Sequence, residues 1–372
     1  MSIFINTERL VQIFLDLVQI DAVSLRERPV VDYILNFIKK WDLPWVEDQA
    51  GEKLGGNAGN VMVHVHNHKQ LEPIFLCAHT DTVRPTKGIT TKIRDGVIFS
   101  DGTTILGADN RAGVAILLYV LEHVFETRYP HRPFDLIFTI AEEIGLLGAA
   151  HLDAERLPSR MGFVFDSSLP PGNYIATTPS AVRLLIELQG KAAHAGVAPE
   201  KGINAISMAA EVLQAFPVGR VDDQTVANIG TIRGGDASNV VPASVRMEGE
   251  IRSFNSHTID RLVQGLENTL SEVARKYGGS YTFDYETHFQ GFSIAPDHDL
   301  TRRLKQKMEK LGLVPTPKLY HGGSDANIFN AMGRTTINLG IGARNPHGND
   351  EHIAISDLET SARLALALIE MD

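Results

Sequence analysis

Apolar runs and segments of helical period alternate along the first half of the chain. Strands are expected at short apolar runs, and helices where apolar residues recur every three or four positions. Alternating apolar strands and helices predict an α/β fold with a mixed, mostly parallel sheet and helices on both faces. The predicted strands are Asn60–His66, Pro73–Ala78, Phe134–Ile140 and Gly162–Phe165, and the predicted helices are Arg28–Lys40, Asn110–Phe125 and Leu146–Leu152.

The pattern changes near Thr177. The predicted order becomes strand, helix, two strands, helix, strand, which is the βαββαβ order of a ferredoxin-like α+β unit. Because this unit is complete, we interpret residues 178–289 as a domain inserted into a discontinuous domain of residues 1–177 and 290–372. Its predicted elements are Val182–Gln189, Asn204–Phe216, Ala227–Gly234, Ser244–Phe254, His257–Tyr277 and Ser280–Glu286, followed in the first domain by Asp299–Leu311, Thr335–Gly340 and Ile355–Glu370.

The N-terminal segment has the period of an amphipathic surface helix capped by Thr7. Glu8, Arg9 and Asp16 interrupt its apolar positions, and the segment has neither the basic start nor the cleavage site of a signal peptide. No apolar run approaches the ~20 residues that a membrane span requires. We therefore expect a cytoplasmic protein without a membrane partner.

The amino-acid composition and net charge argue against some classes of function. The chain has 372 residues, of which 43% are hydrophobic and 22% are charged, as is typical of globular domains. The formal net charge of −10, without a Lys/Arg cluster, argues against a nucleic-acid partner. Cys77 is the single cysteine, so no disulfide forms within the chain, which fits a reducing compartment.

Histidine and carboxylate residues stand where predicted strands end or a predicted helix begins. Ligands in open α/β sheets bind beyond the carboxyl ends of strands, so these side chains should converge on one crevice. The residues are His79 and Asp81 after PIFLCA, Asp109 in LGADNRAG, Glu142 and Glu143 after DLIFTIA, and Asp166 after GFVF.

Each of these elements has an ordinary alternative. An isolated HxD is usually a solvated turn, Asp109 alone is most simply a helix cap, and Glu142–Glu143 alone is an acidic helix start. Their joint placement favours a metal site, because clustered buried carboxylates without a cation repel one another and become protonated. Asp81, two residues after His79, can accept the second ring N–H of a metal-bound histidine.

A last ligand is expected from the C-terminal part of the first domain. His347 follows the predicted strand Thr335–Gly340 and a Gly-rich turn, which puts it at another carboxyl end. His352 is the near alternative, and its ordinary role is an exposed turn residue. The loop Gly322–Asp325 is a second segment that we expect at the site.

A separate histidine group lies in VMVHVHNH, where His64, His66 and His68 alternate along a predicted strand. Such a group can line one strand face as a metal site. We favour the solvent-facing side of a hairpin strand that turns at Asn67–Gln70, because no carboxylate with matching spacing lies nearby in the sequence.

Together, the segments HTDTV, GADNRAG, AEEIGLLGA, FDSS, GGSDA and HGNDEH resemble the dinuclear zinc exopeptidases, the family of peptidase T, aminoacylase and the glutamate carboxypeptidases. The GADNRAG and HG…EH variants are most similar to peptidase T. The resemblance covers nearly the whole chain. It implies a zinc exopeptidase-like catalytic domain and an inserted lid and dimerisation domain.

The resemblance also implies roles for the residues at the strand ends. It implies two divalent metal ions, and zinc suits the ligands, although manganese or cobalt fits the same site. The Asp109–Asn110 peptide bond is expected to be cis. The implied ligands are His79 and Asp166 for one ion, Glu143 and His347 for the other, and Asp109 for both, with Asp81 as the partner of His79 and Glu142 as the general base.

Residues of the inserted domain and its neighbouring loop complete the implied site. His194 in GKAAHAG would stabilise the oxyanion in the site of a partner subunit, which predicts a homodimer. Asn239 and Arg252 would bind the substrate, and Gly323 and Ser324 would wall its pocket. Without the resemblance, His194 is most simply satisfied within its loop and Arg252 forms a surface salt bridge.

These features predict an aminopeptidase that acts on short peptides, in particular tripeptides. An N-acyl-amino-acid amidohydrolase or a carboxypeptidase is the alternative, since the same metal centre serves all three. A metal- or peptide-binding protein without catalysis is a third hypothesis. It predicts damage to the base or to a ligand, whereas Glu142 and all the expected ligands are present.

Overall fold

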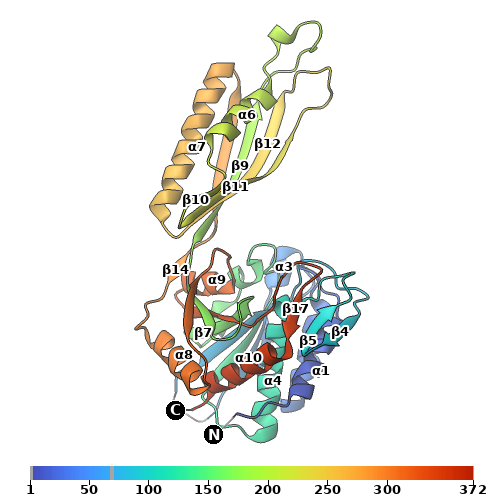
Figure 1. The fold of residues 1–372 in the computed structure, drawn as a ribbon, viewed down its shortest axis with the longest axis vertical. Coiled ribbons are helices and arrows are strands. Elements are labelled where there is room, and N and C mark those ends of the chain that lie inside the picture. The colour runs from blue at the N-terminus through green and yellow to red at the C-terminus, as the bar shows by residue number, and fades with distance from the viewer. Residues whose placement is uncertain (1–2, 68–70, 372) are drawn as a thin grey trace. The chain divides into compact units, whose positions relative to one another are not determined.

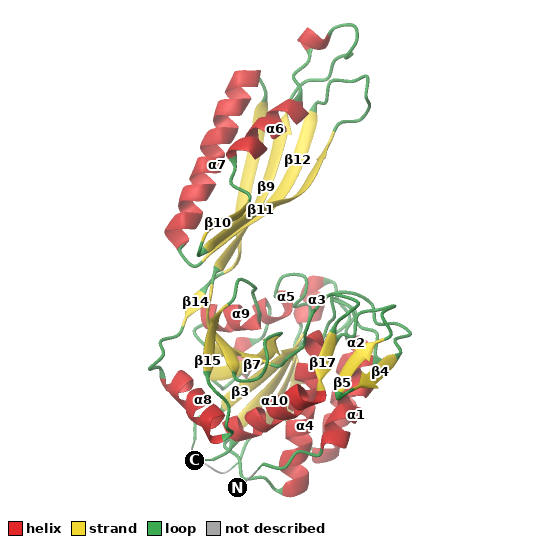
Figure 2. Ribbon diagram, in the orientation of Figure 1, coloured by secondary structure: helices red, strands yellow, loops and turns green. Residues whose placement is uncertain are grey.

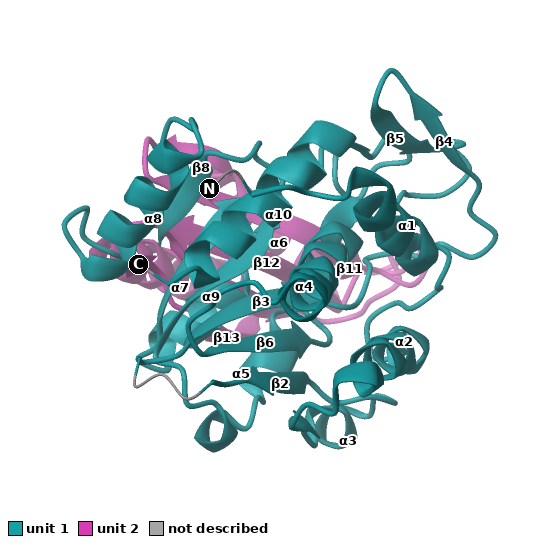
Figure 3. Ribbon diagram, turned by 90° about the horizontal axis from the view of Figure 1, so that it is seen from below, with its two compact units in different colours: residues 1–177, 293–320, 324–372 teal, residues 178–292, 321–323 magenta. Residues whose placement is uncertain are grey.

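The structure is a computed structural model that describes residues 3–67 and 71–371 (Figure 1). The chain divides into two compact units (Figure 3). Unit 1 comprises residues 1–177, 293–320 and 324–372, and unit 2 comprises residues 178–292 and 321–323. Within the described residues, no helix combines the length and the apolar character that crossing a membrane requires.

Unit 1 is built on a sheet that has nine strands within the described residues, in the order β1-β2-β6-β3-β7-β16-β8-β14, with β15 paired to β8. The central pairs β6/β3, β3/β7 and β7/β16 are parallel, whereas β2 is antiparallel to both β1 and β6. This confirms the predicted mixed, mostly parallel sheet. The strands are β1 Trp45–Glu47, β2 Val61–Val65, β3 Ile74–His79, β6 Phe134–Thr139, β7 Met161–Ser167, β8 Asn173–Thr178, β14 Phe292–Ser293, β15 Thr316–Leu319 and β16 Thr335–Gly340.

Helices cover the unit 1 sheet (Figure 2). Strands β3 and β6 are buried at every position, as expected for strands that are covered on both faces. Helix α4 packs so closely on β7 that a Cβ atom added to Gly113 would lie 2.4 Å from the Phe165 carbonyl oxygen. The helices are α1 Thr7–Val18, α2 Arg28–Ile38, α3 Ala50–Leu54, α4 Ala108–Thr127, α5 Leu147–Ala150, α8 Asp299–Lys310, α9 Asp325–Ala331 and α10 Ile355–Ile369.

Helix α1 follows the predicted amphipathic pattern, with its apolar face fully buried, but its predicted cap is wrong. The capping residue is Asn6, whose side-chain oxygen accepts a hydrogen bond of 3.1 Å from the Arg9 amide. Thr7 lies inside the helix, and its hydroxyl donates to Glu359 instead. The asparagine one position earlier therefore satisfies the free amide at the helix start.

The predicted hairpin after β2 is also wrong. Strand β6 lies between β2 and β3 in the sheet, so these two strands do not pair with each other. His64 on β2 is half-buried and lies opposite Asp135 of β6, not on a solvent-facing strand surface. His68 and most of the proposed turn lie outside the described residues.

A small sheet in unit 1 was not predicted, because its strands are too short to show a period. It contains β4 Thr91–Arg94, β5 Val97–Ser100 and β17 His352–Ala354, in the order β17-β5-β4. His352 belongs to this sheet, and its ring stacks on Phe99 with 5.1 Å between the ring centroids.

Unit 2 is an antiparallel sheet with the strand order β10-β11-β12-β9-β13, to which β10 is the unpredicted addition. One sheet face and helices α6 and α7 enclose an apolar core that includes Leu184, Leu188, Met208 and Leu270. The elements are β9 Ser180–Gln189, α6 Ala205–Ala215, β10 Gly219–Asp222, β11 Thr225–Gly234, β12 Ser244–Ser253, α7 Ser256–Tyr277 and β13 Ser280–Phe289.

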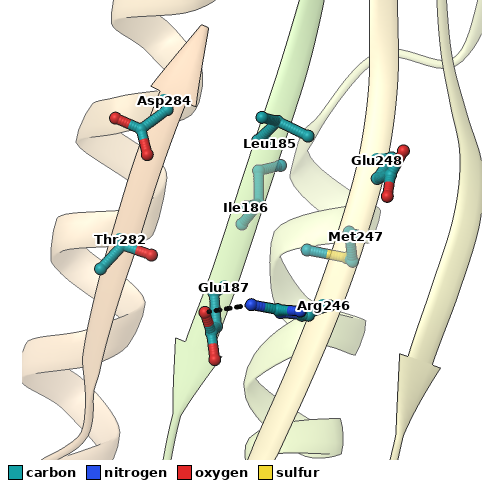
Figure 4. A pocket seen from close by; sticks show the side chains of 8 residues that line it. All are labelled: Leu185, Ile186, Glu187, Arg246, Met247, Glu248, Thr282 and Asp284. Carbon is teal, nitrogen blue, oxygen red and sulfur yellow. Dashed lines mark ion pairs between the residues drawn. The ribbon is translucent and has the colours of Figure 1, made fainter. Parts of the chain in front are cut away.

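Polar side chains line a pocket on the unit 2 sheet, over strands β13, β9 and β12 (Figure 4). Glu187 and Arg246 form an ion pair of 3.5 Å across two of these strands. Thr282 and Asp284 come from the third strand. This alternation of apolar and polar positions is typical of an antiparallel sheet with one covered face.

Candidate metal centre

The carboxyl ends of the parallel strands bring the predicted ligands to one edge of the unit 1 sheet. Strand β3 ends at His79, which pairs with Thr139 at the end of β6. Asp166 is the second-last residue of β7, and Asp109 lies in the first turn of α4. Parallel strands end at the same edge of a sheet, so residues distant in sequence meet there.

Asp109 lies at the centre of this cluster. Its Oδ1 is 3.1 Å from His79 Nε2, and its Oδ2 is 3.4 Å from His347 Nε2. On one side, His79 Nε2 is 3.2 Å from Asp166 Oδ1, and on the other, His347 Nε2 is 3.0 Å from Glu143 Oε2. The five predicted ligands therefore form two groups that share one carboxylate.

Asp81 contacts several of the residues at this edge of the sheet. Its Oδ1 lies 3.3 Å from His79 Nδ1, and its two carboxylate oxygens accept hydrogen bonds of 3.1 and 3.2 Å from the backbone amides of Glu142 and Glu143. Ser24 donates a further bond of 2.6 Å. The hydrogen bond of His79 Nδ1 goes to the Asp81 backbone carbonyl, at 3.1 Å, so the role of the carboxylate in orienting the histidine stays a prediction. The Asp81 carboxylate also holds the backbone of both glutamates, which the sequence did not indicate.

Glu142 points towards the same cluster without a direct bond to it. Its Oε2 is 4.0 Å from His79 Nε2, and its side chain is 11% exposed. Burial and the neighbouring charges of Asp166, Asp325 and Glu143 raise the pKa of Glu142 well above its ordinary value, although His79 opposes them. A carboxyl group with a raised pKa beside reacting atoms is suited to exchange protons.

The other pKa values show that the cluster has more negative charge than its histidines balance. Burial, together with the charge of Asp109, raises the pKa values of Asp166 and Glu143. Hydrogen bonds to Asp109 and Glu143 raise the pKa of His347 to about 10. Burial would raise the pKa of Asp109, but bonds from His347 and His79 lower it. Without metal, protons held between these carboxylates and histidines offset the negative charge. Divalent cations can take the place of those protons, so this donor set fits two such ions.

Glu351 is a supporting residue that the sequence did not reveal. Its side chain accepts hydrogen bonds of 2.6 Å from the Gly107 amide and 2.9 Å from the Asp109 amide. Burial and the charge of Asp109 raise its pKa to about 7. Glu351 thereby holds the backbone of Asp109, next to the Asp109–Asn110 peptide bond, which is cis as predicted. Its position four residues after His347 was the available signal.

Asp325 is a second buried carboxylate near the cluster. Its Oδ2 accepts a bond of 2.5 Å from Thr139 Oγ1, and its buried Oδ1 has no hydrogen-bond partner among the described residues. Burial and the charges of Asp166 and Asp81 raise its pKa to about 7, against the opposing effect of the Thr139 bond and His79. The sequence placed it only in a loop beside the substrate.

The predicted residues of unit 2 fall at two ends of its sheet. His194 and Asn239 are exposed and lie on neighbouring loops, where the Ala195 amide donates a bond of 2.9 Å to the Asn239 carbonyl. On β12, Ser244 pairs with the last residue of β9, whereas Arg252 lies near the start of β9. A strand rises about 3.3 Å per residue, so roughly 26 Å separates these two levels of the sheet. Unit 2 does not bring His194 and Arg252 together within one chain.

Arg252 and the loop beside it have structural partners of their own. The Arg252 guanidinium binds both carboxylate oxygens of Glu250, at 3.2 and 3.0 Å, and the His321 carbonyl at 3.0 Å. A Cβ atom added to Gly323 would lie 2.6 Å from the Phe289 ring. Ser324 is buried and caps α9 in a capping box. Their substrate roles stay predictions.

Comparisons with known proteins agree with this fold. Residues 75–371 match Peptidase family M20/M25/M40, so the chain belongs to this family and is a metallopeptidase, a hydrolase of peptide bonds. Within the family it resembles peptidase T. The structure of aminopeptidase PepT from Bacillus cereus has a TM-score of 0.90 and 35% identity, with 98% of each chain covered.

Two further relatives cover almost the whole chain. The structure of a tripeptidase from Staphylococcus aureus has a TM-score of 0.94 and 32% identity, with 98% of each chain covered. The uncharacterized protein YqjE of Bacillus subtilis (strain 168) is 33% identical over 98% of this chain and 99% of its own length.

Proposed function

We propose that the protein is a zinc-dependent tripeptide aminopeptidase. The observation that carries the proposal is the Asp109 carboxylate, whose two oxygens each face a different histidine, with one further carboxylate on each side. The similarity to an aminopeptidase PepT and to a tripeptidase supports the substrate class. Zinc suits these nitrogen and oxygen ligands, and manganese and cobalt are the alternatives.

Five residues would hold the two metal ions. Each ion would have one histidine and one carboxylate of its own, and both would share Asp109. When bound, such ions polarise the scissile carbonyl group and lower the pKa of a water molecule. The ligands would be His79 and Asp166 on one side, and Glu143 and His347 on the other.

Glu142 would move the proton in the reaction. Its carboxylate accepts a proton from the attacking water and then delivers it to the nitrogen of the departing amine. The hydrogen bonds from the Glu142 and Glu143 amides to Asp81 hold the backbone from which this side chain extends towards the ligands. Arg252 and Asn239 would bind the substrate's terminus or carbonyl, and Gly323 and Ser324 would line its pocket.

A homodimer would complete the site through His194. The distance of roughly 26 Å along the unit 2 sheet, at about 3.3 Å per residue, supports a His194 that serves the partner's site, because Arg252 and His194 cannot contact one substrate from the same chain. A histidine N–H would then donate to the developing oxyanion. We infer a cytoplasmic enzyme from the single, buried cysteine.

Mixed dimers test the role of His194 in the partner's site. His194→Ala and Glu142→Gln homodimers should both be nearly inactive. After subunit exchange, a mixed dimer has one site with both an intact Glu142 and an intact His194, so random mixing should restore roughly a quarter of wild-type activity. No recovery despite proven exchange would show that His194 acts within its own chain.

Product analysis tests the reaction itself. The substrates are one tripeptide in its free, N-acetylated and C-amidated forms, with zinc-loaded enzyme. We expect release of the N-terminal residue from the free and amidated forms and no cleavage of the acetylated form. Cleavage of the acetylated form alone would favour the amidohydrolase, release of the C-terminal residue would favour the carboxypeptidase, and no turnover of any peptide would favour a binding protein.

A further inference from the structure

A second group of metal-ligand side chains lies at the opposite edge of the unit 1 sheet. Asp135 stands near the start of β6, whereas Thr139 at the end of the same strand reaches the candidate metal centre. The four residue steps from Asp135 to Thr139 correspond to about 13 Å along a strand. The group is therefore separate from the five ligands described above.

Two histidines converge on one oxygen of this aspartate. His64 Nδ1 lies 2.8 Å and His66 Nε2 lies 3.1 Å from Asp135 Oδ1. The second carboxylate oxygen accepts a hydrogen bond from Ser159 Oγ. Residues two apart on a strand point to the same side, which is why His64 and His66 can reach the same partner. One atom from each of the three residues lies within 4.8 Å of the others.

Burial makes this carboxylate unusual. The Asp135 side chain is fully buried, and among the described residues its ion-pair partners are the two histidines. Arg334 binds the Ser159 carbonyl nearby but not the carboxylate itself. A buried carboxylate requires either protons donated by its neighbours or a cation. The histidines can donate hydrogen bonds to the carboxylate, and their ring nitrogens can equally serve as ligands for a cation.

Two of the three distances between the candidate ligand atoms are close to those of a zinc site. Zinc binds histidine nitrogen and carboxylate oxygen at about 2.0–2.2 Å, so tetrahedral ligand atoms lie about 3.3 Å apart. The observed distances of 2.8 and 3.1 Å need an expansion of only a few tenths of an ångström. The His66 side chain is 46% exposed, which gives an ion access from solvent and leaves room for water as a fourth ligand.

We propose that His64, His66 and Asp135 form a further zinc-binding site, which ties β2 and the residue after it to β6. The ion replaces the histidine N–H groups that face Asp135, so binding requires both of these nitrogens to be unprotonated. Ser159 keeps the second carboxylate oxygen occupied and leaves Oδ1 as the ligand atom. This corrects the interpretation from the sequence alone, in which no carboxylate accompanied the histidines.

Zinc titration of the intact enzyme tests the site. Protein whose candidate metal centre has been filled with zinc is titrated with further Zn²⁺ and followed by calorimetry and by metal analysis after desalting. Wild type should bind one more equivalent than the metal centre holds. His64→Gln and His66→Gln should bind this equivalent more than tenfold more weakly. His257→Gln, at an exposed histidine of unit 2, is the matched control and should bind as wild type does.

Two further measurements separate a metal site from a merely structural hydrogen-bonded group. Added zinc should raise the Tm of wild type and of His257→Gln but not that of His66→Gln. Anomalous diffraction at the zinc edge should show a peak between His64 and Asp135. Absence of the extra equivalent in wild type, its persistence in His66→Gln, or a peak elsewhere would each overturn the proposal. These outcomes do not depend on peptide cleavage.

Discussion

The two edges of the unit 1 sheet carry the same kinds of side chain in opposite proportions. At the carboxyl edge, the four carboxylates of Asp109, Glu142, Glu143 and Asp166 crowd around two histidines. At the amino edge, Asp135 alone faces two histidines. Burial, together with the charges of neighbouring carboxylates, raises the pKa of three of those four carboxyl groups, whereas the amino-edge carboxylate is satisfied by hydrogen bonds. The carboxyl edge therefore holds more carboxylates than its histidines can pair with, whereas the amino edge does not.

The largest effect is expected from the proton-transfer residue at the carboxyl edge. Glu142→Gln should lower kcat by about 10²–10⁴-fold, because general acid–base catalysis contributes that much. The metal content should not change, since no ligand is altered. Steady-state kinetics with parallel metal analysis would check this, and Glu187→Gln in the unit 2 sheet is a control that should leave kcat unchanged. A variant that keeps more than a tenth of the activity would remove Glu142 from the mechanism.

A weaker effect is expected from the residue that holds the Asp109 backbone. Glu351→Gln retains the shape of the side chain but weakens its bonds to the Gly107 and Asp109 amides. Zinc affinity at the carboxyl edge should fall about 10–100-fold, as is typical when support for a ligand is lost. Competition with a chelator measures this affinity. Equal affinities in Glu351→Gln, wild type and the exposed control Glu52→Gln would contradict the supporting role.

Asp325 should make the free energy of unfolding depend on pH. In metal-free protein its pKa is raised to about 7, so between about pH 4 and 7 the folded state keeps a proton that the unfolded state has lost. The free energy of unfolding should therefore fall as pH rises, by up to about 1.4 kcal/mol per pH unit. Glu351, whose pKa is also raised to about 7, contributes a slope of the same sign, so Asp325→Asn should make the measured slope shallower, by up to this amount, in denaturant titrations of chelator-treated protein at pH 5, 6 and 7. Asp284→Asn, at an exposed site, should retain the wild-type slope.

The smallest effect is expected from a substitution at the amino edge of the sheet, measured as the stability of the metal-free protein. His66 is 46% exposed, so His66→Gln should lower the free energy of unfolding of the metal-free protein by less than about 1 kcal/mol. Denaturant unfolding in the presence of a chelator measures this value. A loss of several kcal/mol would mean that the amino edge depends on its charges as strongly as the carboxyl edge does.

Long regular elements of the fold could be predicted from the sequence because their periods are clear. Strand β16 has the predicted bounds, and α7 differs by a single residue. The insertion of β6 between β2 and β3 could not be predicted, since strand order depends on long-range pairing. The short strands β4, β5 and β17 and the seven-residue helix α9 are too brief to show a period.

The candidate ligands could be predicted because strand ends are recognisable in a sequence. The histidine and carboxylate residues stand directly after apolar runs in the sequence, as His79 and Asp166 do. Glu351, Asp325 and Asp135 escaped this reasoning, because a buried carboxylate and a surface carboxylate look alike in the sequence. Only their burial and their hydrogen bonds to particular amides and hydroxyls distinguish them.

The three-residue segment 321–323 belongs to unit 2 although its neighbours on both sides belong to unit 1. Its His321 carbonyl accepts a bond from Arg252, and Gly323 lies against the Phe289 ring without room for a side chain. A fragment of residues 178–292 would therefore lack part of its own surroundings. Exchange of unit 2 between relatives must transplant two separate stretches, and the residue at 323 has to be matched to the ring at 289.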